Sequence, residues 1–268
     1  MLFRSGLLDE DQLQRLLSAG PARLLVLTHA SNVTGRVQQV ARLAAMAAAQ
    51  GVLVLVDAAQ TAGHWPCRLT DLGADFLALP GHKGLCGPLG TGVLVFRDGT
   101  EALVEPLKFG GTGTDSELLV HPDRLPEKFE CGNLNMPGIA GLAAAAEWVL
   151  EQTPQRLQAD LVRKSDRLLA GLQSLAGLRL LTPEIPGVSC GIVSFVIPGF
   201  DSREAAMVLE QSFGIQCRAG LHCAPLVHAA LGTESTGGAV RLSVGEFTTE
   251  AEVDQAVGAV RDLVSEFV

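Results

Sequence analysis

The sequence predicts an α/β protein with a large domain on a mainly parallel sheet, followed by a small α+β C-terminal domain. In the first half, short apolar runs alternate with helical runs, which is typical of a parallel sheet covered by helices. Beyond about residue 150 the alternation stops, and strands and helices follow one another irregularly. With 47% hydrophobic and 18% charged residues, the chain has ample material for a buried core. We therefore expect a large domain at residues 1–150 and a small domain at residues 151–268.

The first half contains four runs that read as strands. Each is short and almost continuously apolar, as in RLLVLT and VLVLV, which favours a parallel sheet covered on both faces. The Ala-rich run between the first two strands ends at Gly51 and reads as a helix. Strands are expected at residues 23–28, 52–56, 75–79 and 92–96, and helices at 37–50 and 138–150.

The second half begins with a long helical pattern and has fewer strands. We expect a helix at residues 155–175 and strands at 191–197 and 240–244. Between these strands, Asp201 or Ser202 is a suitable N-cap for a helix that ends near Gly214. The last helix opens with Thr249-x-x-Glu252, which has the form of a capping box.

Composition excludes several classes of protein. A formal charge of −9 argues against a nucleic-acid surface, which needs clustered Lys and Arg. The most apolar stretch, residues 43–56, is too short to span a membrane, and the start of the chain does not resemble a signal peptide. The six scattered cysteines do not form a disulfide pattern. We expect a cytoplasmic protein with free thiols and with neither nucleic acid nor membrane as a partner.

Polar residues follow the first three strands of the predicted sheet. The first strand runs into His29-Ala-Ser-Asn32, the second into Asp57-Ala-Ala-Gln60, and the third into Pro-Gly-His-Lys83. The carboxyl ends of parallel strands meet at one edge of a sheet, and ligands bind there. We therefore expect a carboxylate, amides, an imidazole and an amine to converge on one site.

This set of groups suits pyridoxal phosphate (PLP). A partly desolvated lysine such as Lys83 can attack an aldehyde, and a carboxylate such as Asp57 can keep a pyridine nitrogen protonated. Taken singly these signals are weak, because an Asp after a strand is about as often a helix cap and a loop lysine is usually solvated. Zinc is an alternative ligand, although the spacing of the two candidate pairs resembles no common zinc finger. These pairs are His64 with Cys67, and His82 with Cys86.

Six segments, in order along the chain, resemble the motifs of class V aminotransferase-type PLP enzymes, and of cysteine desulfurases in particular. They are THASNVTG (28–35), VDAAQTAGH (56–64), GHKGLCGPLGTGVL (81–94), FECGNLNMPGIAGL (129–142), RAGLHCAPL (218–226) and VRLSVGEFTT (240–249). The resemblance implies a partial PLP-transferase large domain and the conversion of L-cysteine to L-alanine. It also implies a homodimer and leaves room for a sulfur-acceptor protein as a partner.

The resemblance assigns cofactor-binding roles to five positions. Lys83 would carry the cofactor and move protons, while Asp57 would pair with the pyridine nitrogen. Gln60 would donate a hydrogen bond to the ring oxygen, and His82 would lie by the phosphate. Asn133 stands where the family often has a threonine that reaches the phosphate of the neighbouring subunit.

Substrate and sulfur roles fall on the loop after the first strand and on the second half. Asn32 and Arg241 would receive the substrate carboxylate, Arg241 through a bidentate fork. Cys223 matches the catalytic cysteine, whose thiolate attacks the sulfur of L-cysteine and becomes a persulfide. His222 and Arg218 nearby would favour the thiolate. A buried and inert cysteine is the commoner fate of a free thiol.

The chain also departs from the family pattern. The family has a substantial part before the equivalent of residue 1, so we expect an N-terminally truncated member. Pro80 replaces a small hydroxyl residue and cannot donate a hydrogen bond, so weaker cofactor retention is expected. Alternatives are another class V PLP reaction, such as transamination or selenocysteine cleavage, or an inactive truncated remnant. Cys223 favours desulfuration, because transamination needs no thiol.

Overall fold

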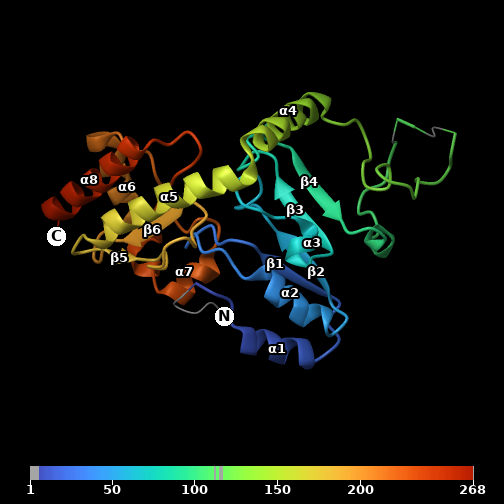
Figure 1. Ribbon diagram of the computed structural model, residues 1–268, viewed down its shortest axis with the longest axis horizontal. Helices are drawn as coiled ribbons and strands as arrows, with labels where there is room; N and C mark the ends of the chain where they lie inside the picture. Colours follow the sequence, from blue (N-terminus) through green and yellow to red (C-terminus); the bar gives the residue numbers. More distant parts are fainter. Residues whose placement is uncertain (1–5, 112, 115–116, 268) are drawn as a thin grey trace.

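The computed structural model describes residues 6–111, 113–114 and 117–267, which form two four-stranded sheets (Figure 1). The first sheet has the order β1-β2-β3-β4 and the second the order β5-β6-β8-β7. The strands are β1 (Leu24–Thr28), β2 (Leu53–Asp57), β3 (Phe76–Pro80), β4 (Gly92–Phe96), β5 (Arg179–Leu180), β6 (Ile192–Val196), β7 (Arg218–Gly220) and β8 (Ala239–Ser243). An α/β half followed by an α+β half is the predicted arrangement.

The first sheet is parallel in three of its four strands. β1, β2 and β3 pair in parallel, whereas β4 runs antiparallel to β3 with Phe76 opposite Phe96. A parallel neighbour requires a crossover connection, usually a helix. The connection at residues 81–91 is instead a compact loop without a helix, in which Gly87 N donates to Gly81 O. This loop returns the chain directly along β3.

One face of the first sheet is covered, chiefly by α2 (Val40–Ala48), beside α1 (Glu10–Ser18) and α3 (Leu69–Leu72). On the opposite face, Leu24 is 45% and Val26 60% exposed. Our expectation that both faces are covered is therefore wrong for the residues that the structure describes. The apolar strands retain the composition of a two-sided core.

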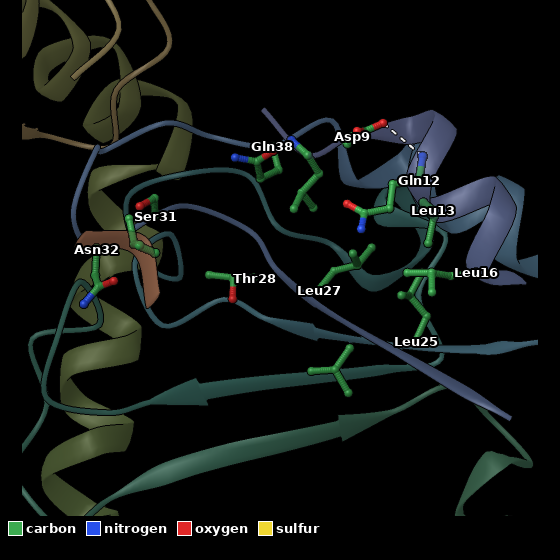
Figure 2. Close-up of a pocket in the computed structure, with 13 residues that line it drawn as sticks. Asp9, Gln12, Leu13, Leu16, Leu25, Leu27, Thr28, Ser31, Asn32 and Gln38 are labelled. Atoms are coloured by element: carbon green, nitrogen blue, oxygen red, sulfur yellow. Dashed lines mark hydrogen bonds between the residues drawn. The ribbon is translucent and has the colours of Figure 1, made fainter. Parts of the chain in front are cut away.

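A groove of about 370 Å³ lies between α1 and the edge strand β1 (Figure 2). Leucines from both elements form its apolar wall, among them Leu13, Leu16 and Leu25. Asn32, in the loop that follows β1, stands at the other end of the groove. The loop after β1 thus lies next to an open part of the large domain.

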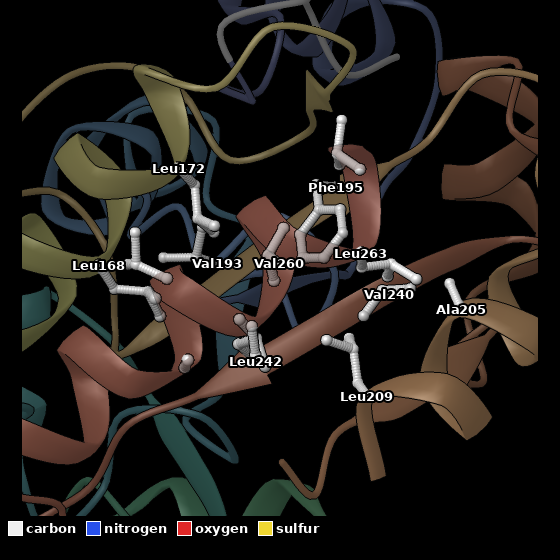
Figure 3. Packing of buried hydrophobic residues seen from close by; sticks show 14 of the residues in the cluster. Leu168, Leu172, Val193, Phe195, Ala205, Leu209, Val240, Leu242, Val260 and Leu263 are labelled. Carbon is white, nitrogen blue, oxygen red and sulfur yellow. The ribbon is translucent and has the colours of Figure 1, made fainter. Parts of the chain in front are cut away.

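The second sheet is antiparallel and is packed against three helices, α5 (Pro154–Gln173), α6 (Ser202–Phe213) and α8 (Glu250–Phe267). Leu172, Phe195, Leu209 and Leu263 are fully buried in this core (Figure 3). Burial of each such side chain stabilises the fold by about 1.5–3 kcal/mol. The sheet is therefore a firm base for the loops that connect its strands.

The predicted helix caps are confirmed. Asp201 accepts a hydrogen bond from Arg203 N, and Gly214 ends α6 in the left-handed conformation. Thr249 and Glu252 form the reciprocal bonds of a capping box at the start of α8. The longer helices agree with the sequence within about three residues at each end, α4 (Met136–Gln152) included.

Backbone and side-chain contacts join the loop after β1 to the region of the second sheet. Ser194 Oγ donates to Val33 O at 2.5 Å, Cys190 N donates to Gly35 O at 2.9 Å, and Arg36 forms an isolated β-bridge with Ser189. The loop after β1 is thereby fixed to the region around β6. This contact brings the ends of the large-domain strands close to the small sheet.

Several short elements were not predicted. Besides α1, α3, β5 and β7, they are α7 (Pro225–Leu231), η1 (Thr100–Leu103) and η2 (Glu234–Thr236). Among the residues that the structure describes, no helix is both long enough and apolar enough to cross a bilayer.

Candidate active site

The carboxyl ends of β1, β2 and β3 lie side by side, as predicted. Thr28 pairs with Asp57, and Asp57 pairs with Ala78 on β3. The Asp57 carboxylate is half-buried and accepts one hydrogen bond, at 2.9 Å from Ala59 N. Asp57 therefore caps the turn after β2 and also presents a carboxylate at the centre of the edge.

Buried neighbours fix the turn that carries Gln60. His29 Nδ1 lies 2.9 Å from the Oγ1 of Thr61, which has no exposed surface. Burial lowers the pKa of His29 to about 4, so its imidazole is neutral near pH 7. His64 Nε2 donates to the Gln60 carbonyl at 2.9 Å. Gln60 is half-buried and follows Asp57 by three residues.

Lys83 and His82 lie in the turn after β3, and both side chains are exposed. The expected desolvation of Lys83 is therefore not observed among the residues that the structure describes, although Leu142 of α4 lies against Gly81 and Gly87 of the same turn. Cys86 N donates to Lys83 O at 2.8 Å and closes the turn. A side chain at Gly81 would come within 2.1 Å of Thr91 Oγ1, so the turn requires glycine there.

Cys190 is a buried thiol just before β6, and its backbone N–H donates to Gly35 O in the loop after β1. Burial raises the pKa of the Cys190 thiol to about 12, and the nearby charges of Arg241 and Lys83 oppose this shift. Both cations therefore lie close enough to one buried thiol to affect its ionisation.

Cys223 lies in an exposed loop between β7 and α7. Its backbone and that of His222 are left-handed, with φ of 60° and 52°, which is uncommon for residues other than glycine. The Cys223 side chain is exposed, and Arg218 Nη2 donates to its Sγ at 3.3 Å. The thiol therefore differs from a buried, inert cysteine, and its sulfur is in direct contact with a guanidinium.

Arg241 and Asn32 join the cysteine loop to the large domain. Arg241 Nη1 donates to Asn32 O at 2.9 Å, and Asn32 Nδ2 donates to His222 O at 2.6 Å. Arg241 Nε is buried and has no partner among the residues that the structure describes. Because a buried N–H group needs an acceptor, Arg241 is ready to bind an anionic group such as a carboxylate.

The position of His222 corrects one expectation. We expected its imidazole to act on the thiol, but the side chain is buried beneath the loop. Its Nε2 lies 3.2 Å from Arg218 O and its Nδ1 lies 3.3 Å from His228 Nε2. Burial lowers the pKa of His222 to about 4. Of the two residues, Arg218 is the one whose side chain contacts Cys223 directly.

The structure does not bring Asn133 into this site, and the zinc pairs do not form a metal site among the residues that it describes. Asn133 is exposed in the segment between η1 and α4. Within the described residues there is no group of three or more His, Cys, Asp or Glu that could hold a metal ion. His64 is bound to a backbone carbonyl, and Cys67 packs against the large-domain core.

Comparison with known proteins decides the family. The model of the family "Aminotransferase class-V" matches residues 2–256. The chain belongs to the class-V aminotransferase family. Within it, the chain is 35% identical over 253 residues to a probable cysteine desulfurase of Methanothermobacter thermautotrophicus. It is 33% identical over 264 residues to cysteine desulfurase CsdA of Escherichia coli K12.

Solved structures show the same fold in other members of the family. The apo cysteine desulfurase of Thermococcus onnurineus NA1 matches 98% of the chain with a TM-score of 0.88 and 33% identity. The E. coli CsdA structure matches 96% with a TM-score of 0.80 and 30% identity. These alignments cover 65% and 63% of the two structures. The two curated relatives match 92% and 94% of this chain, which spans 62% and 61% of their length.

Four residues that support the site were not found from the sequence. Ser194 and Cys190 act through contacts between segments far apart in the chain, which no local pattern reveals. His228 lies in a short helix and Thr233 in the turn after it, without a recognisable motif. A search for polar residues within apolar segments would have flagged His228 and Ser194.

Proposed function

We propose that this chain contributes the cofactor lysine and the sulfur-accepting cysteine of a PLP-dependent cysteine desulfurase. The observation that carries the proposal is the exposed Cys223 thiol, held 3.3 Å from the Arg218 guanidinium in a loop that is bound to Asn32. Asn32 in turn binds Arg241, whose buried Nε lacks an acceptor. Similarity to cysteine desulfurases over most of the chain supports the same reaction.

The chemistry of the polar edge fits PLP. Asp57 supplies a carboxylate for a pyridine nitrogen, Gln60 an amide for the ring oxygen, and Lys83 an amine for the aldehyde. His82 precedes Lys83 in the same turn and would lie by the phosphate. When bound, PLP withdraws electrons from the substrate carbon atoms. Asn133 would reach the phosphate only from a second copy of the chain.

The residues of this chain would divide the reaction between them. Arg241 and Asn32 would bind the carboxylate of L-cysteine. Lys83 Nζ would move the proton at the α-carbon of the substrate. The Cys223 thiolate attacks the substrate sulfur, so a sulfur–sulfur bond forms while the carbon–sulfur bond breaks. The electron pair stays on carbon and takes up a proton, which yields L-alanine. Cys223 is left as a persulfide, whose outer sulfur can pass to a thiol of an acceptor protein.

We also propose a homodimer. The segment between η1 and α4 carries apolar side chains in water, and Leu107 is 98% exposed. Phe109 and Leu119 in the same segment are exposed as well. A second copy that covers this segment would bury apolar surface and would place Asn133 near a neighbouring active site. The oligomeric state in solution, compared with that of Leu107→Asp, tests this.

The free thiols support a reducing compartment. The described chain contains free cysteines that include the exposed Cys86 and Cys223. Disulfides are rare in the cytosol because thiols are kept reduced there. We propose a cytoplasmic location on this ground.

The proposed function is tested by a visible absorption spectrum with added PLP, before and after L-cysteine. A lysine-dependent band that shifts on addition of L-cysteine, with release of alanine, is expected for the wild type and for Lys108→Ala, an exposed control. Lys83→Ala should give no such band. Absence of the band from the wild type would mean that this chain does not form a working centre by itself.

The other PLP reactions are distinguished by Cys223→Ser. Desulfuration requires the thiol, so this variant should bind PLP and L-cysteine yet release no alanine. Transamination would continue without the thiol, and preferential cleavage of selenocysteine would appear when the two substrates are compared.

A further inference from the structure

Three buried side chains lie directly beneath the Cys223 loop and form a continuous row. They are His222, His228 and Thr233, and each is almost wholly inaccessible to solvent. His222 Nδ1 lies 3.3 Å from His228 Nε2, and His228 Nδ1 lies 2.7 Å from Thr233 Oγ1. At the other end, His222 Nε2 lies 3.2 Å from the carbonyl oxygen of Arg218. The row therefore runs from the end of α7 to β7.

With both rings neutral, the hydrogen bonds of this row have one consistent direction, in which the Thr233 hydroxyl donates at the shorter distance to His228 Nδ1, 2.7 Å, rather than to His228 O, 3.3 Å. The Arg218 carbonyl can only accept, so His222 Nε2 carries the proton and His222 Nδ1 accepts. His228 must then donate from Nε2 and accept at Nδ1, where the Thr233 hydroxyl is the donor. Each imidazole is a neutral Nε2–H tautomer, and every polar atom of the row is satisfied. Reversing one ring would place two lone pairs or two protons in contact.

The surroundings keep both rings neutral. Burial lowers the pKa of His228, and it lowers that of His222 to about 4. The guanidinium groups of Arg218 and Arg241 also disfavour a positive charge on His222. A single proton on each ring is what the row requires. The row of hydrogen bonds is therefore intact near neutral pH, where both imidazoles are neutral.

The row holds a strained part of the chain. His222 and Cys223 both adopt left-handed backbone conformations, which persist only where the surroundings enforce them. The row fixes His222 from below, while Asn32 Nδ2 binds the His222 carbonyl from the large-domain side. The row also ends on the backbone of Arg218, whose guanidinium contacts the Cys223 sulfur. One set of bonds thus fixes both partners of the sulfur–guanidinium contact.

We propose that His228 is a positioning residue for Cys223: anchored by Thr233, it holds His222 and thereby keeps the Cys223 thiol beside the Arg218 guanidinium. His228 does not touch the thiol, and its contribution is made through the loop. This role rests on the proposed function in so far as it makes Cys223 the reacting thiol. The arrangement itself needs neither cofactor nor substrate.

The tautomers are tested first, on the wild-type protein, by nitrogen NMR of histidine-labelled chain with PLP. His222 and His228 should both show a protonated Nε2 and an unprotonated Nδ1 at about pH 7.5. Assignment comes from the loss of one signal in His228→Gln. A protonated Nδ1 on either residue would overturn the proposed row.

The positioning role is tested by the alkylation rate of Cys223 with iodoacetamide, followed peptide by peptide with mass spectrometry. Thr233→Val and His228→Leu should slow alkylation of Cys223 about three- to tenfold, because the guanidinium no longer stays beside the sulfur. Thr233→Ser keeps the hydroxyl and His228→Gln keeps a donor toward His222, so both should stay within about twofold of the wild type. Cys86, which is exposed in the lysine turn, is the internal control.

The outcomes separate this proposal from the proposed function. Unchanged alkylation of Cys223 in a folded His228→Leu would show that His228 does not position the thiol, whatever the enzyme does. An equal slowing at Cys86 would show a general loss of structure, and this too would contradict a specific role. If the wild type proves unable to release alanine, the tautomer and alkylation results still stand, since neither depends on turnover.

Discussion

At the scale of single residues, Arg241 combines a structural and a proposed substrate-binding role. Its Nη1 holds the loop after β1 through Asn32 O, while its Nε is buried without an acceptor. Burial lowers the pKa of Arg241 because the charged form loses hydration, and the charge of Arg218 adds to this effect. An incoming carboxylate would restore the missing interactions. The residue is therefore prepared for an anion and is costly to leave without one.

Replacing Arg241 should weaken substrate binding more than cofactor binding. In Arg241→Gln the charge-assisted hydrogen bonds to the carboxylate are lost, so the Kd for L-cysteine should rise about 10- to 100-fold. Spectral titration of the PLP-loaded protein with L-cysteine measures it. Arg261→Gln, at an exposed position of α8, is the matched control. An unchanged Kd in Arg241→Gln would place the carboxylate elsewhere.

The residue types of the site could be predicted from the sequence, but not their surroundings. Asp57 and Gln60 stand at the carboxyl end of the strand that the pattern indicated. Lys83 is exposed rather than desolvated, because burial depends on segments that local sequence does not place. His222 faces inward for a similar reason, since its partner His228 is brought close only by the turn before α7.

At the scale of elements, the caps connect helix stability to the site. The Asp201 side chain accepts from Arg203 N at the start of α6, and α6 packs against β7 and β8. Asp201→Ala should lower the free energy of unfolding by about 1 kcal/mol and the Tm by about 2–4 °C. Asp201→Asn keeps the acceptor and should retain most of the stability. Thermal unfolding of both variants measures the difference, and equal losses would show that the cap is not the cause.

Glycine contacts between β7 and β8 give a second prediction at this scale. A side chain at Gly238 would come within 2.2 Å of Gly220 O, and the φ of Gly238 is +103°. Gly238→Ala should therefore displace β7, which carries Arg218, and should destabilise the small sheet. Hydrogen exchange of the β7 amides should increase in this variant. Gly258→Ala in α8, where nothing lies within 4 Å, should leave it unchanged.

Long elements could be predicted from periodicity and caps, whereas short ones could not. The helices α5, α6 and α8 carry strong patterns, and their cores are buried as expected. β5, β7 and α7 are too short to show a period and form because their neighbours pair with them or cap them. The antiparallel direction of β4 could not be predicted from the sequence either, because an apolar run looks the same for a strand in either direction.

At the scale of the whole molecule, two buried histidines should make stability depend on pH. The pKa of both His29 and His222 is lowered to about 4, whereas an unfolded histidine titrates near about 6.5. The unfolded chain therefore binds more protons between these values, and stability falls as pH decreases from about 6.5 toward about 4. Urea unfolding from about pH 7.5 to about pH 5 should show this slope. His29→Gln should make the slope shallower while His222 maintains the remainder, and a flat wild-type profile would refute the assignment.

The open face of the first sheet is the largest difference between expectation and structure. Leu24 and Val26 have the composition of buried strand residues and yet lie in water. The apolar side chains indicate that this face is suited to burial, but the sequence does not say which segment covers it.

The most direct test of the proposed function is the mass of the Cys223 peptide after the PLP-loaded protein has reacted with L-cysteine under non-reducing conditions. We expect one added sulfur on Cys223, together with release of alanine, in the wild type and in Lys108→Ala. Lys83→Ala should show neither, and Cys86→Ser should behave as the wild type. Alanine released without added sulfur on Cys223, or added sulfur found only on Cys86, would contradict the assignment of Cys223. A PLP-loaded protein that yields neither product would contradict desulfuration by this chain.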